Sequence, residues 1–124
     1  MYTLDTNPII YSINNEEEVV ARLEALFVQA VPLYTSTITE LELFSYLALT
    51  EAEGTLIEVF LRQVRIIPVF SHIARMAGDL RRSYPRLKSF NSAVAATALF
   101  TNSTLVTRNT RDFEQIDDLL LLPI

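Results

Sequence analysis

Two carboxylate side chains are the groups in this sequence best suited to chemistry. Asp5 directly follows a short apolar stretch, and Glu42 lies between Leu41 and Leu43 in a segment with a helical pattern. A bare carboxylate is costly to bury, so an acid at the end of an apolar strand needs hydrogen bonds or a cation. Each acid also has an ordinary alternative role, Asp5 as a helix cap and Glu42 on an exposed helical face. Together they predict a divalent-metal site.

Residue types that other chemistries require are rare or missing. The chain has no cysteine, which excludes disulfides, thiolate metal sites and a cysteine nucleophile. His72 is the single histidine, and a surface or capping role is its simpler interpretation, so a common zinc site is not expected. Gly54 and Gly78 are the only glycines, which excludes a glycine-rich phosphate loop or dinucleotide fingerprint.

Alternating strand and helix patterns supply the elements that must position the acids. Apolar and β-branched runs predict strands at residues 2–4, 31–35, 64–69, 104–107 and, at a sheet edge, 119–122. Helical spacing predicts a helix with Pro8 in its first turn and further helices at 16–29, 37–47, 52–63, 71–83 and 89–101. This alternation predicts one α/β domain over residues 1–124, with a parallel sheet of four to five strands flanked by helices.

Four polar segments lie at the ends of predicted strands or at the start of a predicted helix. Ligands of such sheets bind beyond the carboxyl ends of the strands. This rule selects four segments, which are Asp5 to Asn7, Ser36 to Glu42, the start of the helix at Asn91, and Thr107 to Asp112. We therefore expect segments that are distant in sequence to meet at one edge of the sheet.

Charge is distributed unevenly along the chain, whose net charge is −5. Residues 1–60 carry ten acids and only Arg22 as a base, whereas residues 61–124 carry nine basic residues and five acids. A uniformly basic nucleic-acid binder would look different. An enzyme that holds phosphate through a metal and one basic flank is compatible with this pattern, and ordinary solvated helix faces are the alternative.

Apolar content indicates a folded chain without a membrane segment. Hydrophobic residues make up 50% of the sequence, enough for one core. No apolar run approaches the roughly 18 residues that a membrane helix needs. The first residues, Met1 to Asn7, lack the basic and apolar regions of a signal peptide. We therefore expect a soluble, cytoplasmic protein.

Taken in order, the four polar segments resemble the PIN domain, in particular the VapC-type toxins of toxin–antitoxin pairs. The resemblance covers nearly the whole chain and rests on Leu4–Asn7, Ser36–Leu43, Asn91–Ala98 and Leu105–Phe113. It implies an RNA endonuclease that depends on magnesium or manganese, in which a metal-activated water attacks an RNA phosphodiester. It also implies a cognate antitoxin as partner and a homodimer formed through the early helices.

The resemblance assigns roles to individual residues. The family's first acid, in an Asp-Thr-Asn motif, is Asp5 here, and the second is Glu42, with Glu40 a poorer match. The third position, usually Asp, is Asn91, and the fourth is Asn109. The implied metal ligands are thus Asp5, Glu42, Asn91 and Asn109. The implied catalytic set is Asp5, Glu42, Asn91 and Asp112, and the implied substrate-binding residues are Thr6, Asn7, Thr107 and Arg108.

The amide at Asn91 keeps a second function open. An amide oxygen can ligate a metal but brings no charge, so the substitution should weaken metal binding. One explanation is a degenerate PIN-fold module that binds RNA or a protein partner without cleavage. Another is a substitution that allowed a toxic nuclease to be produced. A phosphatase-like metal hydrolase on a doubly wound sheet is a third, more distant function.

Two surfaces have more than one interpretation. A basic flank precedes and follows the Asn91 helix, and it comprises Arg81, Arg82, Arg86, Lys88, Arg108 and Arg111. These side chains can contact RNA phosphates, bind an acidic antitoxin segment or simply be solvated. The second surface is apolar and comprises Ile9, Ile10, Ile13 and Leu47. These side chains suit either a dimer interface or the core.

Overall fold

Five parallel strands form one sheet through the centre of the protein. The computed structural model describes residues 1–124, and its strands lie in the order β3-β2-β1-β4-β5. Their bounds are Tyr2–Leu4 for β1, Leu33–Ser36 for β2, Arg65–Ile67 for β3, Thr104–Thr107 for β4 and Leu121–Pro123 for β5. Every neighbouring pair is parallel, so each return to the sheet needs a crossover, and every crossover contains a helix.

The sheet register aligns the carboxyl ends of the three middle strands. Leu4 of the central strand β1 lies opposite Thr35 of β2 and Val106 of β4. The next residues along these strands, Asp5, Ser36 and Thr107, therefore lie at the same level, at the carboxyl edge of the sheet. This alignment brings together the segments that the sequence predicted to meet.

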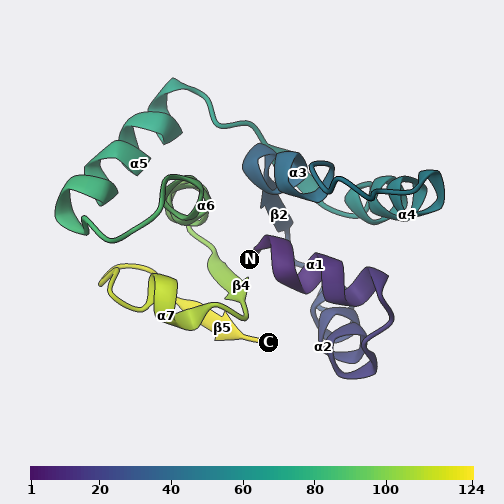
Figure 1. The fold of residues 1–124 in the computed structure, drawn as a ribbon. Coiled ribbons are helices and arrows are strands. Elements are labelled where there is room, and N and C mark those ends of the chain that lie inside the picture. The colour runs from purple at the N-terminus through teal and green to yellow at the C-terminus, as the bar shows by residue number, and fades with distance from the viewer.

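Seven helices cover the two faces of the sheet. Their bounds are Thr6–Ile13 for α1, Glu17–Phe27 for α2, Thr37–Leu43 for α3, Glu51–Leu61 for α4, Ser71–Ser83 for α5, Ser89–Phe100 for α6 and Thr110–Phe113 for α7. Figure 1 shows α1, α2 and α4 on one side of the sheet and α5 and α6 on the other. None of the seven combines the length and the apolar character that crossing a membrane requires.

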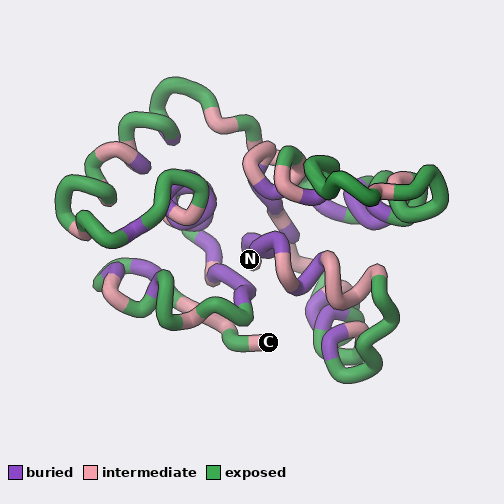
Figure 2. Tube along the Cα trace, in the orientation of Figure 1, coloured by how far each residue is buried: buried purple, intermediate pink, exposed green.

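The hydrophobic core has a part on each face of the sheet, because side chains alternate along a strand. Val106 packs with Leu4 and Ile9 on the α1 face, whereas its neighbour Leu105 packs with Phe113 on the α6 face. Each such side chain contributes about 1.5–3 kcal/mol by leaving water. Figure 2 shows these buried positions along the strands and the inner sides of the helices.

Helix α6 is the most deeply buried helix. Residues Ser92 to Ala98 are all buried, and four of these seven are alanines. Small side chains let this helix approach both the sheet and α5 closely, as close-packed interiors require. The close packing fixes the first turn of α6, including Asn91, at the carboxyl edge of the sheet.

The α/β class, the parallel sheet and the edge position of the fifth strand are confirmed. The helix expected over 37–47 is wrong, because α3 ends at Leu43. The Ser45 hydroxyl donates to the carbonyl of Glu42 at 2.9 Å, a local bond that competes with helix continuation. The short α7 was not predicted. Helix α1 begins at Thr6, because Asp5 caps it, and the expected Pro8 lies in its first turn.

Candidate metal and phosphate site

Asp5 is buried at the junction of β1 and α1. Its Oδ1 accepts the backbone N–H of Thr6 at 2.9 Å, and its Oδ2 accepts the hydroxyl of Thr107 at 2.8 Å. The first bond is the N-cap of α1, and the second ties Asp5 to the end of β4. The capping role and the site role considered for this acid are therefore compatible, since each oxygen keeps a lone pair for another partner.

Glu42 reaches the same place from α3. Its Oε1 accepts the hydroxyl of Thr6 at 2.7 Å, so Thr6 contacts both acids, Asp5 through its N–H and Glu42 through its side chain. Glu40 lies instead beside a separate hollow on the outer side of α3, lined by Phe44 and Arg62 among others. Residues two apart on a helix point in different directions, which is why only one of these two glutamates faces Asp5.

Asn91 and Asp112 line the same hollow as Glu42 and contact each other. The amide Nδ2 of Asn91 donates to Oδ2 of Asp112 at 3.3 Å, which joins the first turn of α6 to α7. An open hollow of about 420 Å³ lies here and is lined by Glu42, Lys88, Ser89, Phe90, Asn91, Asn109 and Asp112. The hollow thus collects side chains from α3, α6 and the segment after β4.

Like charges and burial act together on Asp5. Burial is the largest effect and raises the pKa of the Asp5 carboxyl, while the bonds from Thr107 and Thr6 partly offset it. The nearby Glu42 and Asp112 carboxylates raise the pKa further. Perturbed acids of this kind cluster at functional sites, because a bound cation relieves the unfavourable charge.

The donor set fits an open site for a hard divalent cation. No three acidic or histidine side chains lie close enough to enclose a metal ion by themselves. Magnesium keeps several waters and is often held by one or two carboxylates plus substrate phosphate. Asp5 and Glu42, joined through Thr6, satisfy that requirement, and Asn91 and Asp112 supply further oxygens across the hollow.

The four residues expected to bind substrate lie in different surroundings. Thr6 and Thr107 are buried and bonded to the acids, and Thr107 also accepts the backbone N–H of Asn109 at 3.0 Å. Asn7 is half-buried in the first turn of α1. The threonines therefore orient the carboxylates.

Arg108 is held by partners outside the hollow. Its Nε donates to the carbonyl of Ile124 at 3.1 Å, its guanidinium covers the ring of Tyr11, and Glu16 lies 3.7 Å away. These contacts draw the side chain toward α1 and the C-terminal strand. Of the residues predicted for the site, Arg108 is thus one that the structure does not bring to the hollow.

The hollow is also lined by two residues that the sequence analysis did not select, Ser89 and Phe90. Lys88 lines it too and was expected only as part of the basic flank. Their position directly before Asn91 was the available signal, because the first turn of a helix that starts at a site shares that site. A second hollow adjoins the first, shares Lys88, Asn91 and Asp112 with it, and is also lined by Arg86 and Arg111.

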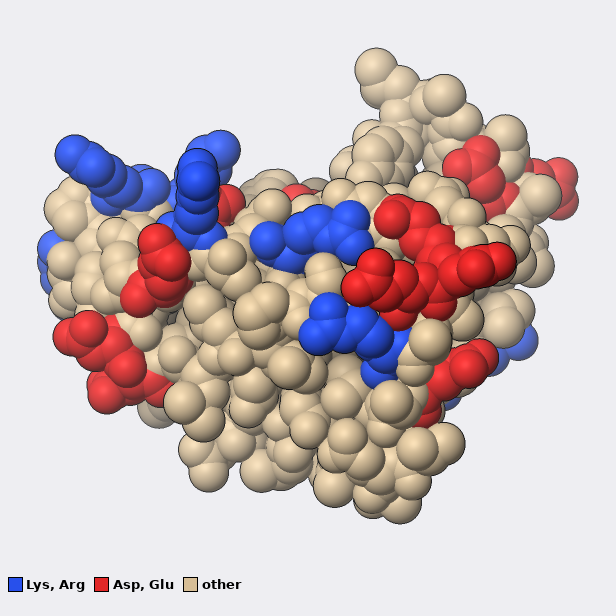
Figure 3. Space-filling model, turned by 90° about the horizontal axis from the view of Figure 1, so that it is seen from below, with Lys and Arg blue, Asp and Glu red and all other residues tan.

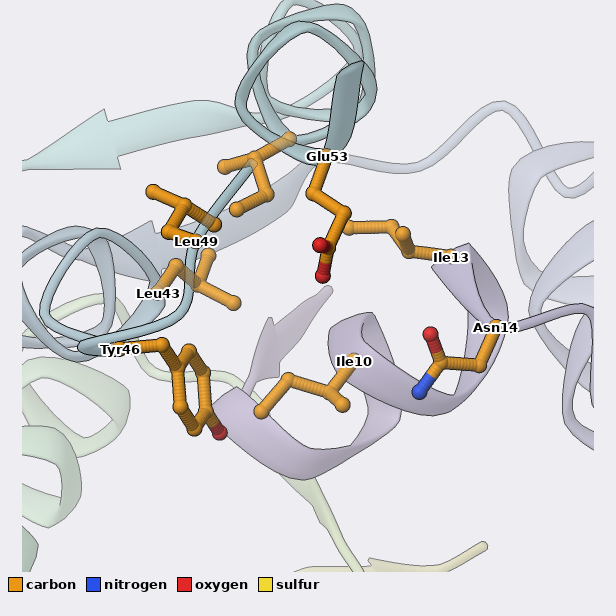
Figure 4. A pocket seen from close by; sticks show the side chains of 8 residues that line it. Ile10, Ile13, Asn14, Leu43, Tyr46, Leu49 and Glu53 are labelled. Atoms are coloured by element: carbon orange, nitrogen blue, oxygen red, sulfur yellow. The ribbon is translucent and has the colours of Figure 1, made fainter. Parts of the chain in front are cut away.

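An apolar pocket lies on the other side of α3. It is lined by Ile10, Ile13, Asn14, Leu43, Tyr46, Leu49, Glu53 and Ile57, and Figure 4 shows the carboxylate of Glu53 turned into it. Partial burial and the nearby Glu42 carboxylate raise the pKa of Tyr46, so the pocket borders the acidic site. Ile9 is fully buried in the core, whereas Leu47 is fully exposed.

Charge on the face that Figure 3 shows is mixed rather than concentrated. Figure 3 shows basic and acidic side chains interspersed on the face seen from below, without a continuous basic surface. Two arginines of the predicted flank are engaged locally, since Arg82 pairs with Asp79 and Arg81 donates to the carbonyl of Leu87. Long-range attraction of a polyanion would therefore be weak, and phosphate contact would depend on a few residues beside the hollow.

The sequence matches the PIN domain family over residues 2–119, and the chain belongs to this family. No curated protein matches it. Similar solved structures include VapBC2 of Rickettsia felis bound to a promoter DNA fragment, at 27% identity and a TM-score of 0.87 over 99% of this chain and 98% of that chain. A toxin–antitoxin complex from Klebsiella pneumoniae is 28% identical, with a TM-score of 0.82 over 100% of both chains.

A third similar structure is VapBC-1 of nontypeable Haemophilus influenzae, at 26% identity and a TM-score of 0.79 over 98% of this chain and 96% of that chain. The expected family and fold are thus confirmed, and these three similar structures come from toxin–antitoxin systems.

Proposed function

We propose that this chain is a divalent-metal-dependent RNA endonuclease and the toxin of a toxin–antitoxin pair. The observation that carries the proposal is that Glu42 and Asp112 line one hollow and that Asp5, from a third distant segment, is joined to Glu42 through Thr6. Membership of the PIN domain family and the similarity to toxin–antitoxin structures support the same activity.

Asp5 and Glu42 would hold the ion, magnesium or manganese, with Asn91 and Asn109 as further oxygen ligands. When bound, the ion lowers the pKa of a water and neutralises charge on the scissile phosphate. Thr6 and Thr107 hold the two acids in place by hydrogen bonds. Asp112 would accept a proton at Oδ1, since its Oδ2 accepts from Asn91.

The RNA backbone would be held from the basic side of the hollow. Lys88 lines the site itself, and Arg86 and Arg111 line the adjoining hollow. All three are exposed, so they can reach a phosphate without breaking a packing contact. Phosphate contacts of this kind position the strand without reading its sequence.

Cleavage assays test the nuclease directly. Purified protein is incubated with structured RNAs and with DNA of the same sequence, in magnesium, in manganese and in excess chelator. We expect RNA cleavage that requires metal and is lost in Asp5→Ala. Asp118→Ala, which changes an exposed acid outside the hollow, is the matched control and should cleave normally. Equal cleavage by both variants would contradict the assignment.

A binding module without cleavage is the second candidate. The observation that favours it is the Asn91 amide, which donates to Asp112 where a third acid would otherwise add charge. RNA binding without cleavage in either metal would support this candidate. Cleavage that chelator abolishes would exclude it.

The partner proposed for the toxin is an antitoxin encoded by a short neighbouring reading frame. The apolar pocket beside α3, with Glu53 turned into it, suits an apolar segment that carries a basic residue. Co-expression should yield a complex in which RNA cleavage is suppressed. Ile13→Glu, which places a charge at a half-buried position of the pocket, should weaken that complex more than Val59→Glu, an exposed position outside it. Sedimentation of the isolated chain tests the predicted homodimer.

A further inference from the structure

Phe90 is an exposed aromatic side chain that no part of the hydrophobic core uses. It is 45% exposed and belongs to none of the three core clusters. Of the other exposed aromatics, Phe70 and Phe100 cover one another, with ring centroids 5.2 Å apart and His72 packed against both. Phe44 and Tyr46 line other hollows. The ring of Phe90 has no such aromatic partner, so its place in the first turn of α6 is not explained by packing.

The surroundings of Phe90 are polar. It is the one hydrophobic residue among the seven that line the hollow, whose other members are Glu42, Lys88, Ser89, Asn91, Asn109 and Asp112. An apolar side chain of a protein partner would need an apolar enclosure, and this hollow does not supply one. A flat group with polar edges is a better fit, because its face can stack on the ring while its edges meet amides and hydroxyls.

We propose that Phe90 is a stacking platform for one nucleobase of the RNA strand, next to the phosphate that the acidic site engages. This inference rests on the proposed function. Stacking on aromatic side chains is a general way in which proteins hold unpaired bases. Asn91 and Asn109 offer amide donors and acceptors beside the ring, and Lys88 offers a cation for the adjoining phosphate. The basic hollow with Arg86 and Arg111 continues the path for the backbone.

The stacking contact predicts a preference for unpaired RNA. A base within a duplex has both faces covered, so only a single-stranded or extruded base can lie on Phe90. Removal of the ring should then weaken RNA binding while the metal ligands stay intact. Phe90→Ala is expected to bind a short single-stranded RNA about tenfold more weakly, within the range of one stacked base. Phe90→Tyr, which keeps the aromatic face, should bind as the parent does.

Fluorescence gives a direct test, because the chain contains no tryptophan. Phe90→Trp places a single reporter at the hollow, and Phe100→Trp places one on the far end of the same helix as the control. Each is titrated with a short single-stranded RNA, with the same RNA carrying an abasic position, and with the duplex. Binding of labelled RNA is followed in parallel by anisotropy, in magnesium and in chelator.

Quenching at position 90 by the single strand, reduced by the abasic position and absent at position 100, would support the proposal. RNA that binds without affecting position 90, or that quenches it equally when abasic, would overturn the stacking role and leave the nuclease proposal standing. Emission at position 90 that changes only with protein concentration would mark the ring as an interface between copies and would overturn it as well.

The two proposals fail differently. Stacking at position 90 without cleavage in either metal would support the role of Phe90 and overturn the nuclease. Failure of the protein to bind RNA in either metal would overturn both. Cleavage that is retained in Phe90→Ala with an unchanged KM for single-stranded RNA would overturn the stacking role alone.

Discussion

Asp5 performs two tasks whose electrostatic demands differ. As the N-cap of α1 it stabilises the helix through the Thr6 N–H, and its charge also suits the positive end of the helix. As a buried acid near Glu42 and Asp112 it is penalised when ionised. Without a cation, the ionised acid therefore reduces the stability of the fold that it helps to begin.

Removing the charge from Asp5 should change the dependence of stability on pH. Burial and neighbouring acids raise its pKa in the folded state, so its contribution to stability is present below the unfolded pKa and is lost as pH rises through the folded value. In chelator, Asp5→Asn, which can still cap α1, should therefore melt higher than the parent at neutral pH. The difference should shrink toward about pH 4. Thermal unfolding across pH measures it, with Asp118→Asn as the control.

The amide at Asn91 can be tested by restoring a carboxylate. Asn91→Asp adds a charge beside Asp112, which should destabilise the metal-free protein and strengthen magnesium binding about tenfold, the scale typical of one metal-site partner. RNA cleavage should rise with it. The readout is the magnesium concentration that gives half of the thermal shift. Asn102→Asp adds the same charge at an exposed position, and an equal effect there would rule out a ligand role for residue 91.

At the scale of elements, helix ends position the site more than helix interiors do. Asp5 begins α1, Ser36 caps α3 by accepting the N–H of Ile38, and Asn91 lies in the first turn of α6. Each of these helices starts at the carboxyl edge of the sheet. A change that shifts one of these helix starts would thus move a site residue. In α3 a change at the far end would do so too, because Glu42 lies one residue before the end of that helix.

The start of α4 allows the stabilising effect of a helix cap to be measured away from the acidic site. Thr50 and Glu53 form a reciprocal capping box at the border of the apolar pocket. Thr50→Ala should lower the free energy of unfolding by about 1 kcal/mol. Thr55→Ala, which removes only a bond to the carbonyl of Glu51 within the helix, should cost less. Denaturant titration compares the two variants. An equal loss of unfolding free energy in both would show that the capping box stabilises the protein no more than the Thr55 bond does.

Element types could be predicted from the sequence because their signals are local. Helix α5 has the expected bounds, Ser71–Ser83, and β4 has the expected bounds, Thr104–Thr107. The end of α3 could not be predicted, because it depends on whether Ser45 bonds to the solvent or to the carbonyl of Glu42. That the polar segments meet could also be predicted, because ligands of parallel sheets bind beyond the carboxyl ends of the strands.

Side-chain direction within the site could not be obtained in this way. The sequence suggested Glu42 over Glu40 only by resemblance, whereas the bond from Thr6 to Glu42 depends on the approach of α1 to α3. Arg108 is drawn away by Tyr11 and Ile124, which are remote in sequence. Such choices depend on tertiary contacts that no local pattern contains.

For the molecule as a whole, a net charge of −5 must be reconciled with a polyanionic substrate. Binding should then depend on a few local cations, and the salt dependence of RNA affinity counts them. Lys88→Ala should reduce the slope of log affinity against log salt by about 0.7, the value for one phosphate contact on a single strand. Arg82→Ala, whose side chain is paired with Asp79, should leave the slope unchanged.

The bond between Thr107 and Asp5 spans 102 positions of the chain. Strand β1 is made first during synthesis, yet it lies in the centre of the sheet and pairs with β4 as well as β2. A nascent chain that has not reached residue 107 cannot complete the acidic site, however well its early helices have formed. The site therefore forms only after the chain has been made as far as β4, a delay that the strand order alone imposes.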